Sequence, residues 1–108
     1  MLKFKVRGSS GDAYEILALR EGDNFRMSCT CEAGRQGTYC KHRFALLDGD
    51  VSNLLSHNSD DVTKLVGLIS GTDVDRRYKV VRELTAQKVN IELKLRLEKK
   101  ALAREMNS

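Results

Sequence analysis

The stretch from Cys29 to His42 reads Cys-Thr-Cys-Glu-Ala-Gly-Arg-Gln-Gly-Thr-Tyr-Cys-Lys-His and contains every cysteine of this 108-residue chain. It follows the pattern C-x-C-x8-C-x-H, which offers three sulfur donors and one imidazole. Tetrahedral zinc in closed structural sites accepts this donor set and leaves no coordination position for a substrate. We therefore expect one structural Zn2+ ion with four ligands: Cys29, Cys31, Cys40 and His42.

The spacing of the two ligand pairs suits such a site. Residues i and i+2 of a strand point to the same face, so Cys29 and Cys31 can both reach one ion from a strand end. Gly34 and Gly37 let the chain curl back, so that the second pair can lie in a loop or in the first turn of a helix. The alternative is three reduced core cysteines, but thiols used only for packing have no reason to gather in a polar loop. A disulfide would leave one cysteine unpaired.

Cys-x-Cys, a short variable loop, Cys-Lys-His and the apolar helical run from Arg43 to Leu47 together resemble the SWIM zinc finger. The resemblance covers Tyr14 to Leu47, and the order and spacing of all four ligands agree with the family pattern. It implies a β-hairpin that carries the first ligand pair, a helix that carries the second, and zinc bound by both pairs. It also implies DNA binding or contact with another protein.

Hydrophobic alternation predicts three strands before and into this motif. Three apolar residues alternate with three basic ones: Leu2, Phe4 and Val6 with Lys3, Lys5 and Arg7. This is the pattern of a strand with one buried and one solvent-exposed face. A second strand is expected from Ala13 to Arg20 and a third from Phe25 to Thr30, joined by a hairpin turn. The predicted fold class is therefore α+β, with a small three-stranded antiparallel sheet and a helix around one structural zinc in residues 1–50.

Helices are predicted for the rest of the chain. A helix from about Lys41 to Leu47 would carry His42 and end near Gly49. Residues 51–72 form an acidic connector with a short helix that begins after the cap residues Asn58–Asp61 and runs to Ser70. Residues 73–108 have no glycine or proline after Val74 to interrupt a long C-terminal helix, which is a possible association element.

The C-terminal segment leaves two conformations open. Apolar and polar residues alternate over residues 88–97, which is typical of a strand, whereas the strong helix formers on both sides favour a helix. In a helix the apolar residues form two stripes: Leu84, Ile91, Leu95 and Leu102 on one, and Ala86, Val89, Leu93, Leu97 and Ala101 on the other. We expect the first stripe to pack on the short helix through Val62, Leu65, Val66 and Ile69. The second would then pair with a second copy of the chain, as a homodimer, or with a partner protein.

Composition favours a binding protein over an enzyme. The chain has no Gly-rich phosphate loop, no nucleophile motif and no H-E-x-x-H zinc site. It shows no pattern of a signal peptide or membrane span, so we expect an intracellular protein with reduced cysteines. The net charge of +4 is compatible with nucleic acid as a partner.

Two functions follow from these features. In the first, the zinc module binds nucleic acid, most simply DNA, without reading sequence. The residues expected to contact phosphates are Lys3, Lys5, Arg7, Arg35, Lys41 and Arg43. In the second, zinc stabilises a protein-interaction module whose C-terminal helix self-associates or docks on a partner. The basic residues would then only solvate a sheet face and protect its edge from aggregation.

Overall fold

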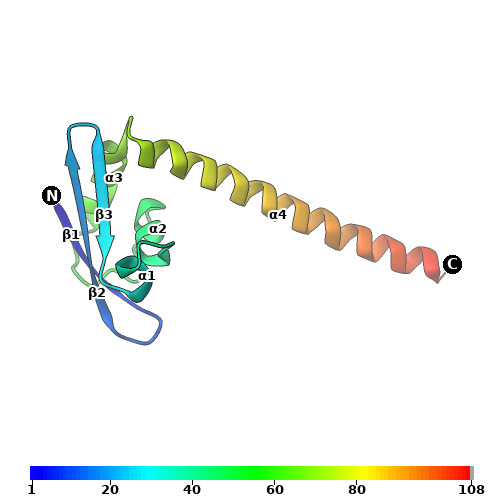
Figure 1. Ribbon diagram of the computed structural model, residues 1–108. Coiled ribbons are helices and arrows are strands. Elements are labelled where there is room, and N and C mark those ends of the chain that lie inside the picture. Colours follow the sequence, from blue (N-terminus) through cyan, green and yellow to red (C-terminus); the bar gives the residue numbers. More distant parts are fainter. Residues whose placement is uncertain (108) are drawn as a thin grey trace. The chain divides into compact units, whose positions relative to one another are not determined.

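The computed structural model describes residues 1–107 (Figure 1). A three-stranded antiparallel sheet is followed by four helices, which confirms the predicted α+β class. The elements are β1 (Leu2–Arg7), β2 (Ala13–Glu21), β3 (Asn24–Cys29), α1 (Glu32–Arg35), α2 (Lys41–Leu47), α3 (Ser59–Ile69) and α4 (Asp73–Met106). Contacts within the chain divide it into two units, Met1–Asp75 and Arg76–Ser108. The short helix α1, between the two ligand pairs, was not expected from the sequence.

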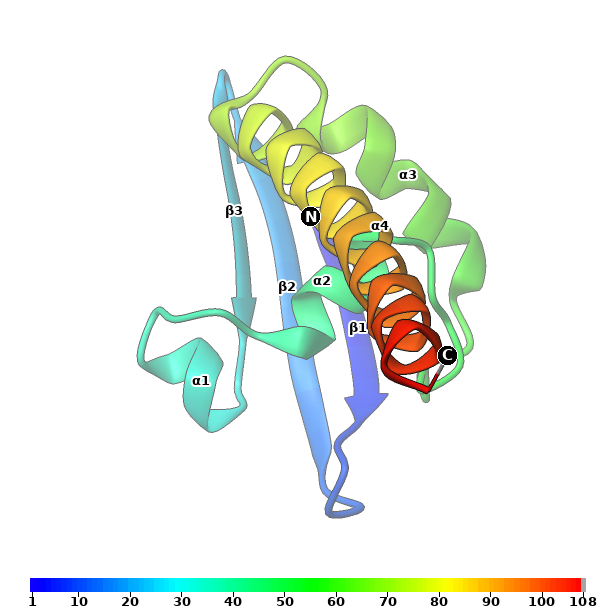
Figure 2. The same ribbon diagram turned by 90° about the vertical axis from the view of Figure 1, so that its right-hand side faces the viewer.

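The sheet has one buried and one open face. The strands pair in the order β1-β2-β3, and Phe4 of β1 lies opposite Ile16 of β2, which in turn lies opposite Cys29 of β3. These three side chains are buried on the face that α2 and α3 cover (Figure 2). Lys3 and Lys5 point to the other face and are exposed, as the alternation of β1 predicts.

The outer edge of β1 is closed by the segment that precedes α3. The amide of Arg7 donates to the carbonyl of Asn53, and the amide of Leu55 donates to the carbonyl of Lys5, at 2.9 and 2.7 Å. The Asn58 side chain donates to the carbonyl of Lys3 at 2.8 Å. Because these groups are paired, β1 is not a free edge strand, and the start of α3 is held against it.

Helix α3 completes the core of the first unit. Val62, Leu65 and Ile69 are at most 4% exposed, and the helix contacts β2 and α2. Arg20 of β2 holds the end of this helix, since its guanidinium donates to the carbonyls of Leu68 and Ser70 at 3.2 and 2.8 Å. Three of the four residues expected to face the C-terminal helix are therefore used in the core of the first unit, and only Val66 is exposed.

Helix α4 is continuous from Asp73 to Met106, so residues 88–97 are helical rather than a strand. Local propensity prevails over the alternating pattern there because no sheet edge is paired with the segment. Both apolar stripes are exposed: Ile91 is 63% exposed and Leu93 44%. None of the described helices combines the length and the hydropathy needed to cross a membrane.

Candidate metal centre

The four predicted ligands come together in the first unit. Cys29 ends β3, Cys31 immediately precedes α1, Cys40 immediately precedes α2, and His42 lies in the first turn of α2. Their donor atoms all lie within 4.8 Å of one another. The three cysteines are buried and unoxidised. The first ligand pair therefore lies between the end of β3 and the start of α1, and the second pair lies at the start of α2.

The separations of the donor atoms fit a small tetrahedral ion. The Sγ atoms of Cys31 and Cys40 are 3.4 Å apart, and the Nδ1 atom of His42 lies 3.6 Å from Cys40 Sγ and 3.9 Å from Cys29 Sγ. Zinc bonds of about 2.3 Å to sulfur and about 2.0 Å to nitrogen at tetrahedral angles require ligand separations of about 3.5–3.8 Å. These three separations are close to the required values and the remaining ones do not exceed 4.8 Å, so the cluster could hold a metal ion such as zinc, with Nδ1 as the nearer histidine donor.

Packing sets the orientation of the histidine. The Tyr14 ring on β2 lies against the imidazole of His42, with 5.0 Å between the ring centroids. Glycine at position 8 makes room for this tyrosine, because a Cβ there would overlap the Tyr14 ring. The Nε2 atom of His42 is buried without a hydrogen-bond partner among the described residues. Contact with an aromatic side chain therefore orients the ring, and no sequence pattern marks this contact.

The local environment separates the acidities of two of the thiols. Burial raises the pKa of Cys29 to about 12, which keeps this sulfur protonated at neutral pH in the absence of a metal. Burial also opposes ionisation of Cys40, but hydrogen bonds from the Arg43 amide and the neighbouring ligand side chains lower its pKa to about 6. Metal binding must therefore release a proton from Cys29, which makes affinity depend on pH.

Arg43 supports the site instead of facing outward. Its guanidinium donates to the carbonyl of Met27 on β3 at 3.0 Å and to the carbonyl of Thr38, in the loop before α2, at 2.7 Å. It therefore ties the strand that ends in the first ligand pair to the loop that leads to the second. This side chain was predicted to contact phosphate, but two of its nitrogen atoms already donate to backbone carbonyls and its Nε is buried.

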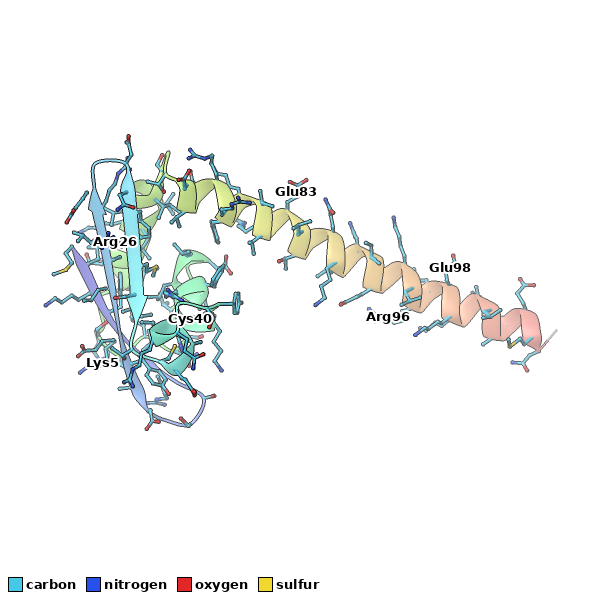
Figure 3. All side chains as sticks on the ribbon, viewed as in Figure 1. Lys5, Arg26, Cys40, Glu83, Arg96 and Glu98 are labelled. Carbon is cyan, nitrogen blue, oxygen red and sulfur yellow. The ribbon has the colours of Figure 1, made fainter. Side chains whose placement is uncertain are left out.

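The other predicted phosphate-binding residues fall into two groups. Lys3, Lys5 and Arg7 lie on the open face of the sheet, whereas Arg35 and Lys41 are exposed at the helices that carry the ligands. Figure 3 shows Lys5 on the sheet and Cys40 among the helices at its other face. Arg26 of β3 joins the first group, because its position alternates with the buried Phe25. The alternation of β3 was the signal that could have placed it there.

Comparisons with known proteins neither add to nor change this description. No protein-family model matches the chain, and neither the curated proteins nor the solved structures contain a match. The assignment of a zinc-finger-like metal centre therefore depends on the four side chains and their geometry.

Proposed function

We propose that the first unit is a zinc-stabilised module that binds nucleic acid without sequence preference through the open face of its sheet. The ion would be held by Cys29, Cys31, Cys40 and His42, and it would supply a rigid link between the end of β3 and α2. No ligand position would remain for a reacting substrate, so the centre supports a structural role. Nucleic acid would then bind to the open face of the sheet, whose fold this link stabilises.

The charge on the open sheet face is the observation that carries this proposal. Four cations lie on it: Lys3, Lys5, Arg7 and Arg26. Among the described residues, none of their side chains has a hydrogen bond or ion pair, so all four ammonium and guanidinium groups can reach a ligand. Glu15 lies opposite Lys5, and Glu21 lies on the same face of β2, so this face carries four cations against two carboxylates. Cations that contact phosphates provide affinity and positioning but do not read the base sequence.

Two leucines between these cations extend the proposed surface. Leu17 lies opposite Lys3 and is 38% exposed, and Leu19 lies opposite Arg26. They offer apolar contact to sugars or bases, but no aromatic side chain of β1–β3 lies on this face for bases to stack on. We therefore expect moderate affinity that is dominated by phosphate contacts and decreases steeply with salt.

The test compares two variants that lose the same number of charges. In the first, Lys3, Lys5 and Arg7 become glutamine; in the matched control, Arg35, Lys41 and Lys64 become glutamine. Binding to a fluorescent duplex is measured by anisotropy over a range of salt concentrations. The sheet variant should bind more weakly and lose about 0.9 from the salt slope for each lost contact. The control should keep most of the slope.

Two results would contradict the proposal. If the intact protein binds neither duplex nor single-stranded oligonucleotides at low salt, the module does not bind nucleic acid. If both variants lose the same fraction of the slope, net charge and not the sheet face determines binding. The alternative function, a protein-interaction module, is favoured by the exposed apolar side chains of α4. Apolar association would not weaken with salt as phosphate contacts do.

A further inference from the structure

The two apolar stripes of α4 differ in length and regularity. The long stripe comprises Val80, Leu84, Ile91, Leu95, Leu102 and Met106, all at least 48% exposed. The short stripe comprises Ala86, Val89, Leu93 and Leu97, where each of the three larger side chains is at least 44% exposed. At about 100° per residue the two stripes lie on nearly opposite sides of the helix. One flat partner surface cannot cover both.

The long stripe has an internal repeat of eleven residues. Val80, Ile91 and Leu102 are separated by this interval, and so are Leu84, Leu95 and Met106. An eleven-residue repeat corresponds to about 3.67 residues per turn, close to the 3.6 of an undistorted α-helix, and it keeps an apolar seam continuous along a helix that packs on another helix. A partner must carry a seam of matching period and length. A second copy of α4 meets this requirement by construction.

Charges next to the stripes distinguish which of them can face a second copy. The long stripe is flanked by both signs, with Lys88 and Lys99 on one side and Glu83 and Glu98 on the other. At about 100° per residue, Arg82, Lys100 and Arg104 lie within the short stripe and Arg96 lies at its edge. From Val80 onward, Glu83 is the only acidic residue in the described part of the helix that lies on the same side as the short stripe. Pairing two short stripes would bring eight like charges together, whereas pairing two long stripes would not.

We propose that α4 is a self-association element in which two copies of the chain pair through the long stripe. This proposal does not depend on nucleic-acid binding, because it concerns apolar and charged side chains of α4 alone. The short stripe with its four cations stays on the outside of such a pair. The dimer would therefore bury the side chains from Val80 to Met106 and present one basic helix face on each copy.

A pair of double variants tests this assignment in the full, zinc-loaded chain. Ile91→Glu with Leu95→Glu places two carboxylates in the long stripe. Leu93→Glu with Leu97→Glu places two carboxylates in the short stripe of the same helical segment and serves as the matched control. Sedimentation velocity at micromolar concentration should show a dimer for the intact protein and for the control. The long-stripe variant should be a monomer.

A measurement of helicity and a milder variant distinguish loss of pairing from loss of the helix itself. Ile91→Ala with Leu95→Ala retains strong helix formers, and it should raise the dissociation constant of the dimer at least tenfold. Helicity measured by circular dichroism should increase with concentration for the intact chain, because an isolated helix with exposed apolar stripes gains its stability from pairing. An intact chain that is monomeric at these concentrations overturns the proposal. So does dissociation of the short-stripe control, whether or not the long-stripe variant also dissociates.

Discussion

Replacing Arg43 with methionine removes the two hydrogen bonds that join β3 to the loop before α2. Hydrogen bonds from a charged donor contribute about 1.5–3 kcal/mol each to stability. Methionine keeps much of the apolar packing of the side chain. An ordered methionine loses about as much conformational entropy as an arginine, so this contribution changes little. The bond to Thr38 is exposed, so water can replace it, whereas the bond to Met27 is partly buried. We therefore expect the free energy of unfolding to fall by about 2–4 kcal/mol.

Urea unfolding at a fixed free zinc concentration measures this change. With a slope of about 1–3 kcal/mol/M, the midpoint should move down by about 1–2 M. Lys41→Met is the matched control, because it removes the same charge from the same helix at an exposed position, and it should change stability by less than about 0.5 kcal/mol. If Arg43→Met leaves the midpoint unchanged but weakens oligonucleotide binding, the guanidinium faces a ligand and its structural role is refuted.

Three further changes test the ligands, the loop between them and the start of α3. Cys31→Ser should release the metal, and a full equivalent of zinc by mass spectrometry would contradict the site. Gly34→Ala should lower the urea midpoint because its Cβ would overlap a carbonyl oxygen of β3; Gly67→Ala, where a Cβ meets open space, should not, and equal shifts would oppose this explanation. The hydrogen bond from Lys64 holds the pKa of Asp61 below its usual range, so this stabilisation is present above the unfolded pKa and is lost as pH falls through the lower folded pKa. Asp61→Asn should therefore melt at a lower temperature than the intact protein at pH 7 but not at pH 2, and a difference that persists in acid would exclude this cause.

Sequence patterns over short stretches predicted the structural features that depend on neighbouring residues. The alternation of β1 placed Phe4 inside and Lys5 outside, because a strand on a one-sided sheet has a period of two. The ligand cluster was predictable because two short pairs, each in a defined local conformation, are enough to surround one ion. The absence of glycine and proline after Val74 and the strong helix formers favoured the helix that continues to Met106, but the alternation over residues 88–97 left a strand open.

Contacts between distant segments left no comparable signal in the sequence. The carbonyl of Lys3 accepts from Asn58, and the carbonyl of Met27 accepts from Arg43, but backbone acceptors are the same at every position and mark no partner. The same reasoning applies to α3. Its apolar face suits either the sheet or another helix, and only the assembled fold shows that Leu65 lies in the core of the first unit.

The metal ligands are themselves part of that core. Among the described residues, three of the twelve buried apolar ones are the cysteines Cys29, Cys31 and Cys40, so the ligand cluster takes the place that aliphatic side chains occupy in a larger domain. One of them, Cys40, has its pKa lowered to about 6, which leaves a thiolate in a buried cluster when no cation is bound. Because the assembled cluster exists only in the folded chain, the free energy of metal binding contributes directly to folding. Loss of metal and unfolding of the sheet with α2 should therefore occur as one cooperative transition. Helix α4 should keep its own dependence on protein concentration, because its stability comes from a different source.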